Sequence, residues 1–181
     1  MKYLFVFILA LVPLTFASAA GQSTSHKGHT SSEMSSGHDA HYLESFSAHH
    51  RDGIEMAKLA EKKARDPQLR KMASKIIKDQ NEELNQMQMW KEKFFSNVQS
   101  EEEAPKKMDM SKLQEAQGKE FDARFAEMMA KHHHDGIKMT KEMLPQLQQE
   151  DVKRFAEKSI TKQTEEIQKL KNLSKKAEKQ S

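Results

Sequence analysis

The chain has 181 residues, with 30 lysines and arginines against 27 aspartates and glutamates, and it contains no cysteine. The lack of cysteine excludes a disulfide framework and removes thiolate as a nucleophile or metal ligand, so soft-metal chemistry would fall to methionine and histidine. Charges of both signs are interspersed, and no basic stripe alternates with aromatic residues. We therefore expect no nucleic-acid partner.

The first twenty residues have the pattern of a secretory signal peptide. Lys2 precedes an apolar run from Leu4 to Leu14, and the segment ends in small residues at Ala19 and Ala20. The apolar run is too short to predict a stable membrane span. We expect a periplasmic or secreted mature protein, with no stable membrane insertion after signal cleavage.

Residues 21–41 are rich in serine, glycine and histidine and contain few apolar side chains. This composition predicts a disordered tail, because such a segment cannot bury a core. A flexible tail of this kind is a candidate metal-binding segment, although a solvated linker explains the composition equally well. Its candidate ligands are His26, His29, Met34, His38 and His41.

Apolar residues at helical spacing predict four helices beyond the tail, and no segment alternates with the period of a strand. The expected elements are helices over 42–65, 67–95, 119–144 and 150–177, with a charged crossover over 96–118 between the second and third. Asp66 and Pro67 suit the N-cap and first residue of the second helix, and Pro145 stops the third. The sequence predicts an all-α, ferritin-like four-helix bundle made of two hairpins.

The two hairpins, over 42–95 and 119–178, repeat each other with a shift of 83 residues and no gap. The shift aligns "HHRDGIEM" at 49–56 with "HHHDGIKM" at 132–139. In the second helix of each hairpin it also aligns Gln80 and Glu83 with Gln163 and Glu166. A single register over both helices indicates that the repeated unit is a whole helical hairpin.

The repeated histidines flank the predicted core seam of their helices. A single histidine there is usually a packed, hydrogen-bonded core residue, but two equivalent pairs, each followed by a methionine, favour metal ligands. The mid-helix glycines Gly53 and Gly136 support this interpretation. A helical glycine costs up to about 1 kcal/mol relative to alanine, so we expect space beside the histidines or a close helix approach to compensate.

Helix geometry indicates which side chains could share one ion. A separation of seven residues spans about 10.5 Å, so His132 and Met139 cannot bind the same metal, nor can His49 and Met56. Residues four apart are neighbours on a helix surface. The candidate chelating pairs are Met128 with His132, Met129 with His133, and Met139 with Met143.

The first hairpin lacks the methionines that precede the histidine pair of the second. Ser45 and Phe46 stand in the places of Met128 and Met129. The sequence therefore predicts a weaker site at His49 and His50, or one that borrows ligands from another helix.

Duplicated acids are candidates for orienting these histidines. Asp52 and Asp135 each lie three residues after a histidine, where a carboxylate could hold an imidazole. Glu83 and Glu166 lie near the seam and could also accept a hydrogen bond from a histidine. A solvated helix face is an equally good explanation for each of these acids.

Imidazole and thioether ligands without thiolate favour Cu(I), or Ag(I) as its mimic, while imidazole alone would also bind Cu(II) or Zn(II). A di-iron carboxylate site would need Glu-x-x-His motifs, but Ser47 follows Glu44 and Ala130 follows Glu127 at that spacing. With no cysteine nucleophile and no convincing catalytic triad, we expect no enzymatic activity.

The pattern His-His-x-Asp-Gly-Ile-x-Met over both repeats resembles domain-of-unknown-function family 305, across roughly residues 40–175. Ferritin-like four-helix members of that family include CopM-type periplasmic copper-binding proteins. The resemblance implies a copper-binding role in metal tolerance and homeostasis, with an unidentified delivery or efflux partner. The ligands it implies are His49, His50, Met56, Met128, Met129, His132, His133 and Met139.

The sequence thus predicts a protein that sequesters or passes on Cu(I). The alternative is a periplasmic helical interaction or chaperone-like protein, whose methionine-rich faces would bind clients while its histidines only pack. The chain lacks the Leu-Thr-x-x-Gln motif of known periplasmic helical chaperones, which disfavours that alternative.

Overall fold

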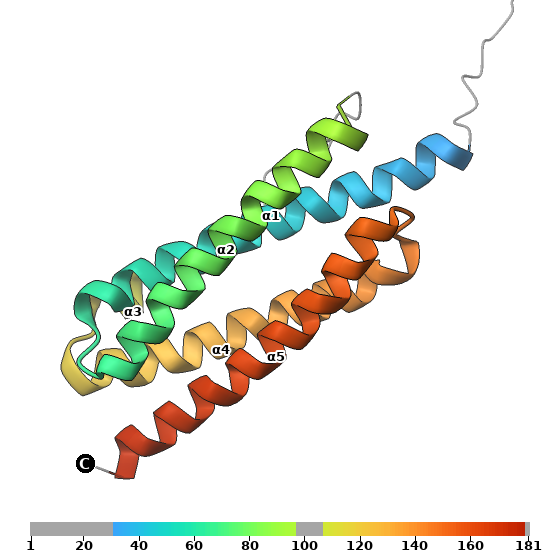
Figure 1. Cartoon of the computed structure of the whole chain (residues 1–181). Coiled ribbons are helices and arrows are strands. Elements are labelled where there is room, and N and C mark those ends of the chain that lie inside the picture. Colours follow the sequence, from blue (N-terminus) through green and yellow to red (C-terminus); the bar gives the residue numbers. More distant parts are fainter. Residues whose placement is uncertain (1–30, 97–106, 180–181) are drawn as a thin grey trace, which may run out of the picture.

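The computed structural model describes residues 31–96 and 107–179. These residues contain no strand, and their long helices form a bundle of two antiparallel hairpins (Figure 1). The prediction of an all-α bundle of two helical hairpins is confirmed. The first hairpin consists of α1 (Ser31–Lys63) and α2 (Pro67–Phe94), and the second of α4 (Gly118–Met143) and α5 (Glu150–Lys179).

Two helix ends follow the local sequence signals. Asp66 caps α2 by accepting a hydrogen bond from the backbone N–H of Gln68 at 2.6 Å, and Pro67 is the first helical residue, as predicted. α4 ends at Met143, and Pro145 lies in the short 3₁₀ turn η1 (Leu144–Gln146) that follows. Proline stops the helix here because it lacks an N–H to continue the hydrogen-bond ladder.

α1 begins at Ser31, so the expectation of disorder over 21–41 is wrong for residues 31–41. The reason is a distant contact of Asp39, which is completely buried. Its carboxylate accepts hydrogen bonds from the backbone N–H groups of Gln148 and Gln149, at 2.8 and 3.0 Å, in the turn before α5. The amino-acid composition of residues 31–41 does not reveal that Asp39 has hydrogen-bond partners in a distant part of the chain.

Asp122 on α4 makes the matching contact with the turn of the first hairpin. Its carboxylate accepts hydrogen bonds from the backbone N–H groups of Arg65 and Asp66, both at 2.8 Å. Asp39 and Asp122 stand 83 residues apart, in the register of the repeat. Each hairpin thus binds the turn of the other through a buried aspartate, and such charge-assisted hydrogen bonds are strong.

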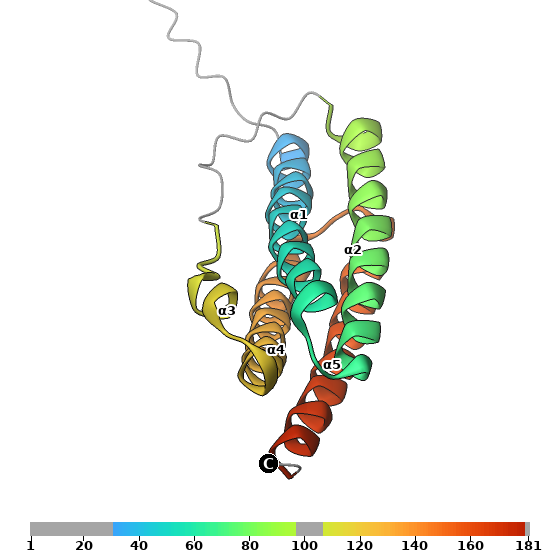
Figure 2. The ribbon, with the colours of Figure 1, turned by 90° about the vertical axis from the view of Figure 1, so that its left-hand side faces the viewer.

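The predicted crossover contains a short helix, α3 (Ser111–Glu115), which lies beside α4 (Figure 2). Met110, Leu113 and Ala116 from this segment are buried in the core, so the crossover is more than a solvated linker. α4 then begins at Gly118, whose φ of +58° lies in the left-handed region that favours glycine. Residues 97–106 of the crossover lie outside the described part of the chain.

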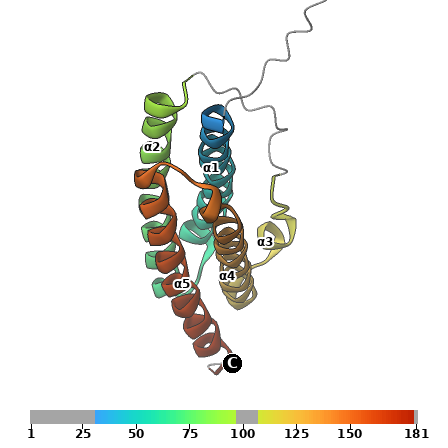
Figure 3. The same cartoon turned by 90° about the vertical axis from the view of Figure 1, so that its right-hand side faces the viewer.

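The hairpins meet mainly through α1 and α4, whereas α2 and α5 run along the opposite side of the bundle and touch little (Figure 3). Two apolar clusters fill the interior. The first cluster surrounds Met56, Leu69, Phe121, Phe125 and Met129. The second cluster surrounds Tyr42, Phe46, Met87, Leu147 and Val152. Within the described residues, every helix is too short or too polar to cross a membrane.

Candidate metal centre

A layer of buried and half-buried polar side chains separates the two apolar clusters. We call this group the polar layer. α1 and α4 each supply two adjacent histidines to it, and α2 and α5 each supply a glutamine and a glutamate. Its members are His49, His50, Gln80, Glu83, His132, His133, Gln163 and Glu166. Every member has a counterpart 83 residues away in the sequence.

Each hairpin contains one buried histidine bonded to a glutamate. His50 Nε2 lies 2.6 Å from Glu83 Oε2, and His133 Nε2 lies 2.8 Å from Glu166 Oε2. Because a carboxylate accepts, each ring donates its Nε2–H. The prediction that Glu83 and Glu166 could hold a histidine is confirmed.

The alternative acids bind elsewhere. Asp52 accepts a hydrogen bond from the backbone N–H of Met108 at 3.2 Å, and Asp135 pairs with Lys131 at 2.6 Å. Both acids therefore use their carboxylates for other contacts, one with the crossover and one on the surface of α4.

The other two histidines stack on each other where α1 meets α4. The ring centroids of His49 and His132 lie 3.7 Å apart, with an angle of 8° between the ring planes. His132 Nε2 donates to the backbone carbonyl of His49 at 3.1 Å. Burial, assisted by the neighbouring histidines, lowers the pKa of His132 to about 3 and lowers that of His49 far below its usual range. Both rings are therefore neutral at neutral pH.

The polar layer contains several buried atoms that have no hydrogen-bond partner within the described structure. They are His49 Nε2, the Nδ1 atoms of His50, His132 and His133, and the Oε1 atoms of Gln80, Gln163 and Glu166. Buried polar atoms nearly always have partners, so such a concentration indicates a binding site. A neutral imidazole that donates Nε2–H carries its lone pair on Nδ1, and metal-bound histidines typically donate their other N–H in this way.

Gly53 and Gly136 make room for this arrangement. A Cβ atom added at Gly53 would lie 2.6 Å from Gln80 Oε1 and 3.0 Å from His132 Cε1. One added at Gly136 would collide with His49 Nε2 and lie 2.8 Å from Gln163 Oε1. The expected space beside the histidines is present, and each glycine leaves it for a histidine of the other hairpin.

The candidate methionine ligands fall into two groups on opposite sides of the polar layer. Met56 and Met129 are completely buried in the first cluster, and Met128 is partly buried against it. Met139 and Met143 are partly buried against the second cluster. Since Met128 and Met129 lie one helical turn before His132 and His133, these two methionines are the sulfur donors nearest to the second histidine pair along α4.

Phe46 gives the first hairpin a different environment. Its ring stacks on His49 with centroids 5.7 Å apart and lies 4.4 Å from the ring of His50. Phe46 occupies the position equivalent to Met129, so an aromatic ring packs where the second hairpin has a sulfur atom.

The remaining predicted ligands lie away from the polar layer or outside the described residues. His38 is exposed, and His41 is half-buried on α1. The backbone of Met34 belongs to α1, but its side chain lies outside the described part, as do His26, His29 and the predicted signal peptide. In the described residues, no three histidine and carboxylate side chains already surround one point suited to a metal ion.

Sequence reasoning passed over two features of the site. One is the stacking of His49 on His132, and the other is the pairing of Lys162 on α5 with Asp79 and Glu83 on α2. Both join residues of different hairpins, and neither follows from spacing along one helix. The glutamines of the layer do have a sequence signal, because the 83-residue shift aligns Gln80 with Gln163.

The fold and the polar layer define a class of four-helix bundles with a buried histidine centre. The chain belongs to the DUF305 family, a domain of unknown function, whose family model matches residues 39–174. A search of curated proteins found no match.

Solved structures agree with this assignment. CopM in the Cu(I)-bound form is 29% identical, with a TM-score of 0.68, over 76% of this chain and 96% of that one. CopM in the Ag-bound form obtained by co-crystallization is 30% identical, with a TM-score of 0.66 and the same coverage. A DUF305 protein from Streptomyces coelicolor, 22% identical with a TM-score of 0.72 over 79% of this chain and 95% of that one, shares the fold.

Proposed function

We propose that this protein binds copper, with Cu(I) favoured, and sequesters it or passes it on in the periplasm or outside the cell. In this proposal the protein is not an enzyme, and it contributes to copper tolerance and homeostasis. One observation carries the proposal. His50, His132 and His133 are buried, each uses Nε2–H for a hydrogen bond, and each has a buried Nδ1 with no partner.

The available ligands suit a soft monovalent ion. The second histidine pair lies one turn from Met128 and Met129, so imidazole nitrogen and thioether sulfur occur together on α4. This combination favours Cu(I) and its mimic Ag(I) over harder ions. The similarity to CopM, with Cu(I)-bound and Ag-bound forms, supports the same assignment. Because the rings of His49 and His132 are stacked, they would have to separate to bind one metal together.

The alternative of a client-binding helical protein receives less support from the described surface. Met89, with 54% of its side chain exposed, is the large hydrophobic residue that this surface presents. Met56, Met87 and Met129 are completely buried, and Met128, Met139 and Met143 are partly buried against the two apolar clusters, which leaves little methionine surface for a client.

Native mass spectrometry of the mature protein under reducing conditions tests the proposal. We expect Cu(I) adducts that survive a modest excess of a competing Cu(I) chelator. Loss of every adduct to the chelator, with the helical circular dichroism spectrum intact, would refute specific Cu(I) binding. Suppression of client aggregation independently of copper would favour the alternative.

A further inference from the structure

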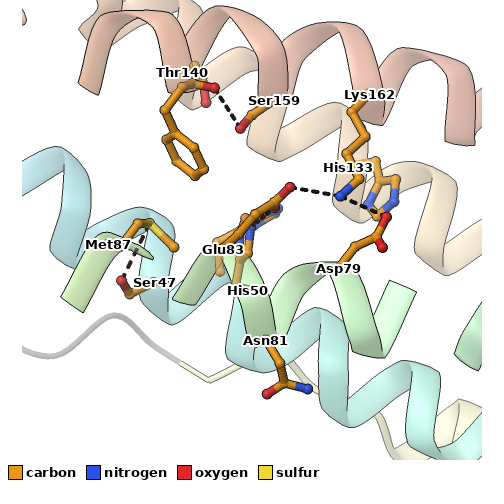
Figure 4. Close-up of polar contacts among 12 residues, drawn as sticks. Ser47, His50, Asp79, Asn81, Glu83, Met87, His133, Thr140, Ser159 and Lys162 are labelled. Atoms are coloured by element: carbon orange, nitrogen blue, oxygen red, sulfur yellow. Dashed lines mark hydrogen bonds and ion pairs between the residues drawn. The ribbon is translucent and has the colours of Figure 1, made fainter. Parts of the chain in front are cut away.

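Lys162 on α5 bridges the two hairpins beside the polar layer (Figure 4). Its ammonium nitrogen lies 2.8 Å from Asp79 Oδ2 and 2.8 Å from Glu83 Oε1, both on α2. The side chain of Lys162 is 28% exposed, and those of Asp79 and Glu83 are 17% and 20% exposed. The ion pairs are therefore partly shielded from water, and they join helices that otherwise touch little.

This bridge connects directly to a histidine of the polar layer. Glu83 uses one carboxylate oxygen for Lys162 and the other for His50 Nε2, at 2.6 Å. The positive charge of Lys162 is thus one carboxylate away from a candidate metal ligand. In the second hairpin, Glu166 bonds His133 through one oxygen, while its other oxygen is buried without a partner.

The repeat shows why this lysine is unusual. The 83-residue shift aligns Lys162 with Asp79, so the two equivalent positions carry opposite charges and bind each other across the hairpins. By contrast, every member of the polar layer has the same residue type in both hairpins. Lys162 therefore supplies a cation between two carboxylates, the place that a divalent ion with oxygen ligands would favour.

We propose that Lys162 is a selectivity residue, whose ammonium group occupies the space between Asp79 and Glu83 and so keeps divalent cations out of the centre. This inference rests on the proposed function. The repulsion grows with the charge of the incoming ion. At about 10 Å and an effective dielectric constant of about 20, one positive charge weakens the binding of a monovalent ion roughly fifteenfold and that of a divalent ion by roughly a few hundredfold.

Removal of Lys162 should act on divalent ions in a second way. It would free one oxygen of Glu83 and leave Asp79 with Lys75 as its remaining lysine partner. Both carboxylates would then be more available as hard ligands, which suit divalent cations better than Cu(I) or Ag(I). Both effects change the preference in the same direction. The lysine favours monovalent ions even though it lies outside the set of residues proposed to touch the metal.

The test compares Lys162→Gln with the wild-type mature protein, using Ag(I) and Zn(II) because neither ion changes oxidation state during the titration. Dissociation constants come from competition titrations, and circular dichroism monitors the fold. We expect Lys162→Gln to tighten Zn(II) binding at least about tenfold more than Ag(I) binding. The matched control, Lys169→Gln, removes an exposed lysine of α5 that pairs with Glu165, and should change both ions by less than about threefold.

A double variant identifies the source of any gain in Zn(II) affinity. Adding Asp79→Asn to Lys162→Gln should remove most of the gain, since a carboxylate of the vacated space is lost. Equal changes for Zn(II) and Ag(I) in Lys162→Gln, or a Zn(II) gain that survives Asp79→Asn, would overturn the selectivity role. Failure of the wild-type protein to bind Ag(I) or Cu(I) would instead overturn the proposed function, so the two failures are distinguishable.

Discussion

At the scale of single residues, the histidines of the polar layer combine a structural contact with a free nitrogen. His50 and His133 donate to glutamates, and His132 donates to a backbone carbonyl of the other hairpin. These bonds fix the ring orientations and leave Nδ1 without a partner. The cost of burying such atoms is of the order of 1–3 kcal/mol each, which a structural role alone would not explain.

The space above Gly136 is needed for this packing. Gly136→Ala is expected to lower the free energy of unfolding by about 1–3 kcal/mol, because the added Cβ collides with His49 and Gln163. Gly37 on α1 is the matched control, with nothing within 4 Å of an added Cβ. Gly37→Ala should stabilise the protein by up to about 1 kcal/mol through helix propensity. Urea unfolding monitored by circular dichroism measures both changes, and a stabilising Gly136→Ala would contradict the packing described here.

At the scale of helices, two buried aspartates bind each hairpin to the turn of the other. Asp39 belongs to α1 and binds the turn before α5, while Asp122 belongs to α4 and binds the turn before α2. Each turn consists of backbone groups that leave the helical ladder and need acceptors. The reciprocal contacts fix how far α1 and α4 slide along each other, and so fix which histidines meet.

Asp39→Ala and Asp122→Ala should each lower the free energy of unfolding by about 2 kcal/mol or more, because two backbone N–H groups lose their acceptor in a partly buried turn. Asp135→Ala is the control. Asp135 pairs with Lys131 on the exposed face of α4, and its loss should cost less than about 0.5 kcal/mol. Chemical denaturation measures all three variants. A cost for Asp39→Ala as small as that for Asp135→Ala would show that the N-terminal part of α1 is not held in place by this contact.

At the scale of the whole molecule, the two hairpins share a plan but differ at the centre. Phe46 packs on the first histidine pair, whereas Met129 precedes the second. Glu83 is engaged by Lys162, whereas one oxygen of Glu166 has no partner. Both differences favour metal binding at the second hairpin.

The sequence predicted features that depend on neighbours along the chain. The Asp66 cap, the stop at Pro145 and the inward position of the histidine pairs all follow from local propensity and helical period. The 83-residue register also predicted that the two hairpins are equivalent. It indicated Glu83 and Glu166 as candidate hydrogen-bond partners of the histidines. It could not identify which partner a buried acid takes, because that depends on packing between elements.

The missed features all involve contacts between hairpins or with the crossover. Asp39 was assigned to a disordered tail because its partners lie in the turn before α5. The role of Lys162 has no local sequence signal, because its two acids are on another helix. The 83-residue register also pairs Asp39 with Asp122, and this pairing is a sequence signal that α1 begins before residue 42.

The most direct test of the central claim is a Cu(I) competition titration of two matched variants. The first replaces the second-hairpin candidates Met128, Met129, His132 and His133 with alanine. The second replaces the residues that lie 83 positions earlier, Ser45, Phe46, His49 and His50. With helicity verified for both, we predict that the second-hairpin variant loses more Cu(I) affinity, by at least about tenfold, since it alone loses the thioether ligands. Equal losses, or no loss in either variant, would contradict a copper centre built on the second histidine pair.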